Sequence, residues 1–309
     1  MSCHINADGD AIGSLLAMGS ILKRLKKKYW MVMHDNSPDP KFKFLKDFDK
    51  ILNYQEEEAR NWNFDSAVIL DTADLDRLGD VKKLLKREEK MPILNIDHHI
   101  SNTNFGTINL VDQKASSTCE LIYLITKNIE NFKIDKSLAY QIYTGIIYDT
   151  GRFSFSNTTT KSMEICAEML KKGVDCHEVS KHIYFEKSFE SIQLLGLGLK
   201  SMELYLNGKV GLIAFEKRRL SKNQNSDIDL DNLVNYATAV KGVEVGILLR
   251  EEEEGRFRVS LRSKDRVDVN KIAKVFNGGG HFKAAGCYIK GNLKETKNQL
   301  LRELQRVVK

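Results

Sequence analysis

Short apolar segments that end in acidic residues or histidine limit what this chain can fold into. Two of them are "SAVILDTAD" (66–74) and "PILNIDHH" (92–99), and a helical pattern at 77–90 separates them. A similar segment at 29–35 follows an amphipathic helical pattern at 11–28. Short apolar strands that alternate with helices are typical of βαβ units. We therefore predict an α/β fold with a mostly parallel sheet flanked by helices, in which ligands bind beyond the carboxyl ends of the strands.

The sequence also indicates a second domain, because 309 residues exceed the usual size of one compact core. Helical patterns continue to residue 201, and strand-like runs predominate after it. Asn207 and Gly208 separate two of these runs, which is a strong hairpin signal. We predict an α/β domain over 1–186, a helical connector over 187–201 and a smaller α/β domain over 202–309.

Composition narrows the cellular setting and the partners. No apolar run approaches the ~20 residues that cross a bilayer, and the first residues do not form a basic and apolar signal. We therefore expect a cytoplasmic protein without a membrane partner. Five cysteines without CxxC pairing predict neither a disulfide framework nor a zinc site. The formal net charge of +6 weakly favours a phosphate-bearing partner.

Acidic residues and histidines gather in four short stretches. They are His4, Asp8 and Asp10; Asp71; Asp97, His98 and His99; and Asp149. A single aspartate at a strand end is more often a helix cap, and a single histidine is more often structural. The first three stretches, however, end strands of one inferred sheet, so their side chains can converge. Asp149 follows an apolar helix that can bring it in from the side.

Such a cluster of carboxylates calls for a cation, because the groups would otherwise raise one another's pKa. Imidazole and carboxylate ligands without a thiolate suit Mn²⁺ or a related transition metal, whereas Mg²⁺ prefers oxygen ligands and waters. Six potential ligands are too many for one open site but suit two ions that share a bridging carboxylate. Two ions of this kind activate water for phosphoryl displacement, so the sequence predicts hydrolysis of a phosphoester.

Five motifs occur in the order found in one known family. They are "HINADGDAIGS" (4–14), "DTAD" (71–74), "DHH" (97–99), "YDTGRF" (148–153) and "GGGHFKAAG" (278–286). They resemble the DHH phosphoesterase superfamily with its C-terminal DHHA1 domain, over nearly the whole chain. The length and "SLRS" (260–263) look most like the nanoRNase and pAp phosphatase group. This resemblance implies an enzyme that degrades very short RNAs, removes the 3′-phosphate of 3′-phosphoadenosine 5′-phosphate (pAp), or does both.

The resemblance also implies a role for each residue of the cluster. It assigns two Mn²⁺ ions, which Mg²⁺ or Co²⁺ could replace. One ion is held by His4 and Asp8, the other by Asp10, His98 and Asp149, and Asp71 bridges both. Asp97 is expected to orient His98, since a metal-bound imidazole usually donates its other N–H to an acceptor. His99 is expected to lie near the substrate phosphate.

The second domain contributes a glycine-rich loop. Three adjacent glycines, Gly278, Gly279 and Gly280, let backbone N–H groups approach an anion, although they suit a simple turn equally well. The resemblance favours substrate binding, and it implies that the loop and the "SLRS" strand hold the nucleotide. The substrate-binding candidates are therefore the three glycines, Arg262, Ser263 and His281, with Lys283 a weaker candidate.

Other functions remain open at this point. Within the enzymes they are a RecJ-type single-strand exonuclease, a phosphodiesterase of linear or cyclic dinucleotides such as pGpG or pApA, and a family II inorganic pyrophosphatase. The pyrophosphatase is disfavoured because its second domain lacks the "GGGH" loop. A non-catalytic nucleotide-binding or RNA-binding module is a further alternative, opposed by the intact set of ligands. The sequence is also compatible with a homodimer.

One departure from the family pattern concerns the first ligand. In relatives a helix and an apolar strand normally precede the histidine, whereas only three residues precede His4 here. We therefore expect that the strand that anchors His4 is largely missing and that the first metal site is held less securely than the second.

Overall fold

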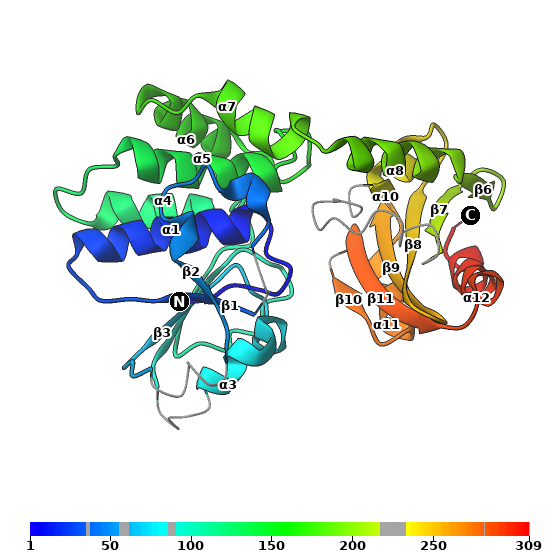
Figure 1. Cartoon of the computed structure of the whole chain (residues 1–309), viewed down its shortest axis with the longest axis horizontal. Helices are drawn as coiled ribbons and strands as arrows, with labels where there is room; N and C mark the ends of the chain where they lie inside the picture. Colours follow the sequence, from blue (N-terminus) through cyan, green and yellow to red (C-terminus); the bar gives the residue numbers. More distant parts are fainter. Residues whose placement is uncertain (35–37, 56–61, 86–90, 217–232, 281, 309) are drawn as a thin grey trace. The chain divides into compact units, whose positions relative to one another are not determined.

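The computed structural model describes residues 1–34, 38–55, 62–85, 91–216, 233–280 and 282–308. They form two compact units, Met1–Glu186 and Lys187–Lys309 (Figure 1). Each unit combines strands with helices that cover them, which confirms the predicted α/β class.

Parallel strands form the sheets of the first unit. β1 (Met31–Met33) pairs with β2 (Ile51–Asn53), while β3 (Ala67–Leu70), β4 (Ile93–Asp97) and β5 (Ile108–Val111) pair in that order. Every one of these pairs is parallel, as the alternation of strands and helices predicts. The carboxyl ends of β3 and β4 therefore lie at the same edge of their sheet, where parallel sheets bind ligands.

The first residues of the chain join these two sheets. The carbonyl of Met1 accepts a hydrogen bond from the N–H of Val32 in β1 at 3.0 Å. On the other side, Ser2 donates to the carbonyl of Val68 at 3.0 Å and accepts from the N–H of Leu70 at 2.9 Å. The strand that we predicted to be largely missing is thus a single parallel bridge to β3.

Helices pack on both sides of these strands in Figure 1, with α1, α4 and α5 together on one side and α3 on the other. The helices of this unit are α1 (Gly9–Arg24), η1 (Pro40–Phe42), η2 (Phe48–Lys50), η3 (Leu75–Val81), α3 (Lys82–Leu85), α4 (Thr118–Asn128), α5 (Lys136–Asp149), α6 (Thr160–Lys171), α7 (Cys176–Ser180) and η4 (Lys181–Phe185). Ile12, Leu15 and Leu16 of α1 are fully buried in the core, as their helical spacing predicts.

The helix predicted over 77–90 differs from the structure. Its first part is a 3-10 segment, η3, followed by the single turn α3, and residues 86–90 lie outside the described residues. Gly79 interrupts the helical backbone with φ +59° and ψ −137°. A glycine adopts this conformation at little steric cost, so it ends the regular pattern that the apolar spacing suggests.

A six-stranded sheet forms the second unit. In spatial order its strands are β10 (Gly279–Gly280), β11 (Ala284–Lys290), β9 (Arg256–Ser263), β8 (Val245–Glu253), β7 (Val210–Phe215) and β6 (Glu203–Tyr205). Neighbouring strands are antiparallel except for the parallel pair β7 and β8. The predicted hairpin at Asn207 and Gly208 is confirmed, since both residues have positive φ between β6 and β7.

Each face of this sheet has its own hydrophobic core. One core forms with α11 (Val269–Val275) and α12 (Leu293–Gln305), and the other with α8 (Phe189–Lys200) and α10 (Leu233–Ala239). The helix predicted as a connector is α8. Its fully buried Leu194 belongs to the same core as Phe215 of β7, so α8 packs as part of the second unit.

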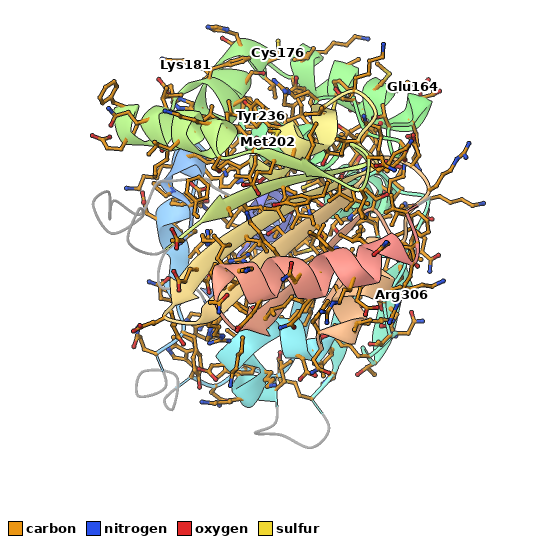
Figure 2. All side chains as sticks on the ribbon, turned by 90° about the vertical axis from the view of Figure 1, so that its right-hand side faces the viewer. Glu164, Cys176, Lys181, Met202, Tyr236 and Arg306 are labelled. Carbon is orange, nitrogen blue, oxygen red and sulfur yellow. The ribbon has the colours of Figure 1, made fainter. Side chains whose placement is uncertain are left out.

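Figure 2 shows the side chains of the described residues, among them the exposed Glu164 of α6, Cys176 of α7 and Lys181. All five cysteines are free thiols, and only Cys176 is exposed. Among the residues with a described position, no helix is long and apolar enough to span a bilayer.

Candidate metal centre

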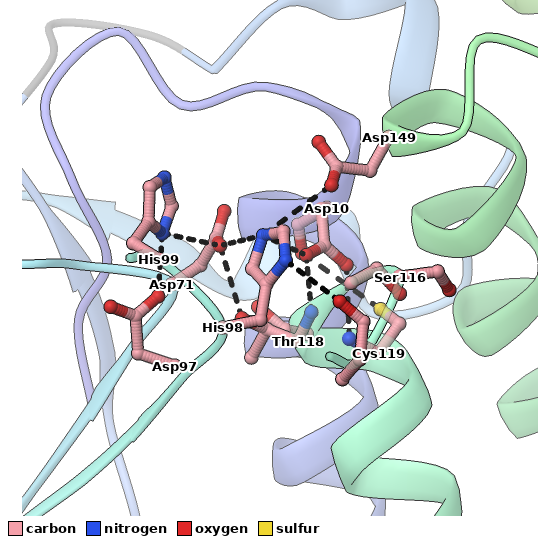
Figure 3. A network of polar contacts seen from close by, with 12 residues as sticks. Asp10, Asp71, Asp97, His98, His99, Ser116, Thr118, Cys119 and Asp149 are labelled. Atoms are coloured by element: carbon pink, nitrogen blue, oxygen red, sulfur yellow. Dashed lines mark hydrogen bonds and ion pairs between the residues drawn. The ribbon is translucent and has the colours of Figure 1, made fainter. Parts of the chain in front are cut away.

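The predicted cluster lies at the carboxyl ends of β3 and β4. Asp71 directly follows β3, and Asp97 is the last residue of β4, with His98 and His99 after it. Asp10 lies in the first turn of α1, and Asp149 ends α5 and reaches the cluster from the side (Figure 3). Elements far apart in the sequence therefore bring their polar side chains to one edge of the sheet.

Ligand atoms of this cluster fall into three groups, in each of which they lie within 4.8 Å of one another. The groups are His4, Asp8 and Asp71; Asp10, His98 and Asp149; and Asp71, His98 and His99. Asp71 belongs to two of them. The first two groups correspond to the two ion sites that the resemblance implies, with Asp71 between them.

Asp71 occupies the middle of the cluster. Its Oδ2 lies 3.5 Å from Nε2 of His4, and its Oδ1 lies 3.6 Å from Nε2 of His98. Thr118 donates its hydroxyl hydrogen bond to the same Oδ1 at 3.0 Å. The backbone of Asp71 has φ +53°, a left-handed conformation that L-residues rarely adopt and that tends to occur at functional sites.

Two histidines point the same ring nitrogen at these carboxylates. Nδ1 of His4 donates to the carbonyl of Ile5 at 2.8 Å, and Nδ1 of His98 donates to the carbonyl of Ala115 at 3.3 Å. These contacts leave Nε2 of each ring toward the cluster, where Nε2 of His98 also lies 3.4 Å from Oδ2 of Asp149. A backbone acceptor that fixes the tautomer is typical of metal-binding histidines.

Asp8 and Asp10 both use backbone N–H groups for orientation. Oδ1 of Asp8 caps α1, since it accepts from the N–H groups of Asp10 at 3.0 Å and Ala11 at 3.1 Å. Asp10 is fully buried and accepts from Thr118 N–H at 2.6 Å and Cys119 N–H at 3.0 Å. The N-terminus of α4 thus holds the Asp10 carboxylate, where the helix dipole favours negative charge.

The prediction that Asp97 orients His98 is wrong. Oδ1 of Asp97 accepts instead from Nδ1 of His99 at 2.6 Å, and the acceptor for His98 is the backbone carbonyl of Ala115. Asn102 donates to the other oxygen of Asp97 at 2.6 Å. Unlike His4 and His98, His99 turns Nδ1 toward Asp71, at 3.6 Å from Oδ1, and Asp97 already engages that nitrogen, so we place His99 outside the set of ligands.

The charges of the cluster are poorly balanced without a cation. Burial raises the pKa of Asp10 and of Asp149 well above the usual value, and neighbouring carboxylates raise both further. Burial acts in the same direction on Asp71, but its contacts with His4, His99 and His98 outweigh it and lower the pKa. Carboxylates and imidazoles that share protons in this way suit a divalent cation that would displace the protons.

Three asparagine and threonine side chains that sequence reasoning missed hold this arrangement. They are Asn102 on Asp97, Thr118 on Asp71, and Asn157, which donates to the backbone carbonyls of Asp149 at 3.0 Å and of Ser116 at 2.9 Å. Asn102 follows the "DHH" motif by three residues, and Thr118 begins α4. Neither spacing identifies its partner, because the partner of Thr118 lies 47 residues away and that of Asn102 depends on how the loop after β4 folds back.

The predicted substrate-binding residues of the second unit lie on neighbouring strands. Arg262 and Ser263 end β9, and Arg262 pairs with Ala284 of β11. Ser263 is buried and its hydroxyl has no hydrogen-bond partner among the described residues. His281 lies outside the described residues.

The glycines of the loop differ in what their positions require. A Cβ at Gly278 would lie 2.2 Å from the carbonyl oxygen of Gly286, and one at Gly280 would lie 2.4 Å from that of Ala284. Gly280 also has φ +147°. A Cβ at Gly279, by contrast, would meet no atom within 4 Å. Packing against β11 therefore explains two of the three glycines, and the middle one faces open space.

Comparisons with known proteins agree with this picture. Residues 1–146 match the DHH family N-terminal domain, and residues 212–309 match the DHHA1 domain. Two relatives named bifunctional oligoribonuclease and PAP phosphatase are each 30% identical to this chain. The one from Thermus thermophilus aligns over 94% of this chain and 84% of its own length, and the one from Bacillus subtilis over 93% and 87%.

A solved structure is also similar over almost the whole length. It is that of an exopolyphosphatase-related protein from Bacteroides fragilis, which is 29% identical, with a TM-score of 0.91 over 99% of this chain and 91% of the other. The paired domains, the order of the motifs and the two relatives lead to one assignment. The chain belongs to the DHH family of phosphoesterases with a DHHA1 domain, and it is a hydrolase.

Proposed function

We propose that this chain is an Mn²⁺-dependent phosphoesterase with two metal ions, which hydrolyses short oligoribonucleotides to mononucleotides and removes the 3′-phosphate of pAp. The observation that carries the proposal is the position of Asp71 between His4 on one side and His98 on the other. The names of the two 30% identical relatives support both substrates.

The donor atoms fit two transition-metal ions. His4, Asp8 and Asp71 would hold one ion, and Asp71, Asp10, His98 and Asp149 the other. Two imidazoles among four carboxylates favour Mn²⁺ over Mg²⁺, with Co²⁺ as another fitting ion. When bound, such ions supply Lewis acidity that activates water and neutralises phosphate charge.

In this proposal, His99 and its partner Asp97 assist the attack of the activated water on the substrate phosphate. Asp97 holds the Nδ1–H of His99, so the other ring nitrogen, Nε2, is left for a substrate atom. Burial opposes protonation of His99, but Asp97 and Asp71 outweigh it and raise its pKa. His99 thus keeps a proton available and can donate a hydrogen bond to a phosphate oxygen while the leaving oxygen gains charge.

The second unit is proposed to hold the nucleotide. Arg262 supplies a guanidinium whose planar donors match phosphate oxygens, and Gly279 offers a backbone N–H without an obstructing side chain. Ser263, Gly278, Gly280 and His281 complete the proposed substrate-binding set. In this proposal residues 1–186 form the catalytic domain and residues 202–309 the substrate-binding domain, joined by the helical segment 187–201.

An assay of the purified chain with defined substrates tests the proposal. With Mn²⁺ present, we expect mononucleotide from a labelled dinucleotide and AMP plus phosphate from pAp, and no reaction after chelation with EDTA. Asp71→Asn, which is isosteric, should abolish both reactions while the circular dichroism spectrum stays unchanged.

Three outcomes would contradict the proposal or part of it. Absence of turnover on both substrates at every Mn²⁺ concentration would leave a non-catalytic binding module or a different phosphoester substrate. Near-normal activity of Asp71→Asn would refute the bridging role. Faster cleavage of pGpG or of long single strands than of pAp and short RNA would favour a dinucleotide phosphodiesterase or a RecJ-like exonuclease instead.

A further inference from the structure

An unusual turn follows the proposed ligand Asp149. Three consecutive residues, Gly151, Arg152 and Phe153, have left-handed backbone conformations with φ of 54°, 59° and 62°. Two of them are not glycine, and this conformation is unfavourable for L-residues with a Cβ. Such strain is maintained only where the surroundings determine it, and it occurs preferentially at functional sites.

Hydrogen bonds to the end of α5 maintain this turn. Arg152 donates its backbone N–H to the carbonyl of Ile147 at 2.9 Å, and the N–H groups of Ser154 and Phe155 both donate to the carbonyl of the buried Thr150 at 3.0 Å. A Cβ at Gly151 would lie 2.5 Å from the ring of Phe155. The turn therefore fixes where the side chain of Arg152 begins, three residues after Asp149.

The guanidinium of Arg152 is exposed and lies over an aromatic ring near the end of α5. Its Cζ is 4.7 Å from the ring centroid of Tyr184, whose hydroxyl donates to the carbonyl of Ile147 at 3.1 Å. Burial raises the pKa of Tyr184, the charge of Arg152 lowers it, and the charges of Asp149 and Asp8 raise it further. The backbone N–H of Arg152 and the hydroxyl of Tyr184 thus both donate to the carbonyl of Ile147, two residues before the proposed ligand Asp149.

The guanidinium of Arg152 differs from that of Arg24 in its partners. Among the residues that the structure describes, no carboxylate forms an ion pair with the guanidinium of Arg152. Arg24, in contrast, stacks on Phe132 at 5.1 Å and forms an ion pair with Asp135. Stacking orients the planar donors of Arg152, while their hydrogen-bonding capacity is left for an anion.

We propose that Arg152 binds a phosphate oxygen of the substrate at the metal centre. The proposal rests on the proposed function, because it assumes that the phosphoester is held beside Asp149. A phosphate group is the chemical match for the site, since a guanidinium with two parallel N–H donors binds its oxygens in pairs. Tyr184 is then a positioning residue, which holds the guanidinium in place without touching the substrate.

Binding of phosphate-containing products tests this role without turnover. Isothermal titration of the Mn²⁺-loaded protein with inorganic phosphate and with AMP compares Arg152→Met, Arg152→Lys and the matched control Arg24→Met. Arg24 also stacks on an aromatic ring but lies at the opposite end of α1 from Asp10. We expect the dissociation constants of both ligands to rise about tenfold or more in Arg152→Met, because a charge-assisted hydrogen bond is lost.

The control variants separate this role from a structural one. Arg152→Lys keeps the charge without the paired donors, so it should show a smaller rise, and Arg24→Met should stay within twofold of the unmodified protein. Mn²⁺ affinity should not weaken in any of the three. Phosphate and AMP binding within twofold of normal in both Arg152 variants would overturn the proposal, as would a loss confined to AMP. If the unmodified protein binds phosphate but does not turn over pAp or short RNA, only the proposed function fails.

Discussion

Asp97 and His99 form a close pair, with Nδ1 of His99 2.6 Å from Oδ1 of Asp97. Asn102 donates to the second oxygen at 2.6 Å and also to the carbonyl oxygen of the Asn95 side chain at 2.8 Å. The two residues of the "DHH" motif that we place outside the ligand set are therefore linked to each other and supported by Asn102 and the buried Asn95.

Asp97→Asn should lower kcat by about 10- to 100-fold, a range typical of residues that hydrogen-bond to an active-site side chain and orient it. An amide has one acceptor, so it cannot serve both His99 and Asn102. Steady-state kinetics with pAp measures the effect. Asn102→Ala removes only one donor and should lower kcat less. A normal kcat in Asp97→Asn would show that His99 needs no carboxylate partner.

Thr118 offers a test of how Asp71 is oriented. Its hydroxyl donates to Asp71, while its backbone N–H donates to Asp10 and is retained when valine or serine replaces the side chain. We expect Thr118→Val to weaken Mn²⁺ binding about tenfold, measured by titration calorimetry. Thr118→Ser keeps a hydroxyl and should bind Mn²⁺ within twofold of normal. Equal affinities of the valine and serine variants would contradict this role.

Stabilisation by Mn²⁺ should increase with pH. The raised pKa values of Asp10 and Asp149 mean that the metal-free fold loses stability as pH rises from their ordinary values towards the raised ones. The raised pKa of His98 acts likewise above pH ~6.5. Metal must displace these protons, so it binds more tightly at high pH.

The measurement for this prediction is the change in Tm that a fixed free Mn²⁺ concentration causes, relative to EDTA. At 100 times the dissociation constant, binding contributes about 2.7 kcal/mol to the free energy of unfolding. We expect a larger change at pH 8 than at pH 6. Asp71 does not contribute to this difference, because its lowered pKa keeps it ionised at both pH 6 and pH 8. Equal changes at both pH values would argue against proton displacement.

Arg262→Ala should raise KM for pAp more than it lowers kcat, because the proposed contact exists before and during the reaction. Arg256→Ala is the matched control, since Arg256 begins the same strand and half of its side chain surface is buried. We expect near-normal kinetics from the control. A pure kcat effect of Arg262→Ala would assign Arg262 to the transition state instead.

We expect substitution by alanine to have different effects on stability and KM at Gly279 and at Gly280. Gly280→Ala should destabilise the second unit by about 1–3 kcal/mol, since the new Cβ would overlap Ala284 at a positive φ. Gly279→Ala should leave the stability unchanged and raise KM if its backbone approaches an anion. Chemical denaturation and steady-state kinetics, made on both variants, distinguish the two effects. Equal stabilities would show that β10 can move away from β11.

The sequence predicts which elements meet at the site but not how their side chains pair. The cluster could be predicted because Asp71 and Asp97 end neighbouring parallel strands, so the topology alone brings them together. The partner of Asp97 could not be predicted, because it depends on the backbone that follows β4 and on which carbonyl lies behind His98. The carbonyl is that of Ala115, from the segment before α4.

The position of α8 could not be predicted for a similar reason. Its helical pattern is clear over 188–201, but a pattern does not say which partner covers its apolar side. The partner is β7 with α10, and one contact, that of Gly198 with the ring of Phe215, depends on the absence of a side chain. From the sequence alone, a helix between two domains can be assigned to neither of them, because the residues that it packs against are not known.

The segment of Met1 and Ser2 has a thermodynamic consequence. It is hydrogen-bonded to β1 on one side and to β3 on the other, and two residues later the same chain supplies His4. An ion held by His4 therefore also resists separation of the two sheets. The two sheets and the metal centre should then unfold as one cooperative unit. Hydrogen exchange at the amides of Val32 and Leu70 should accordingly be slower when the metal is bound.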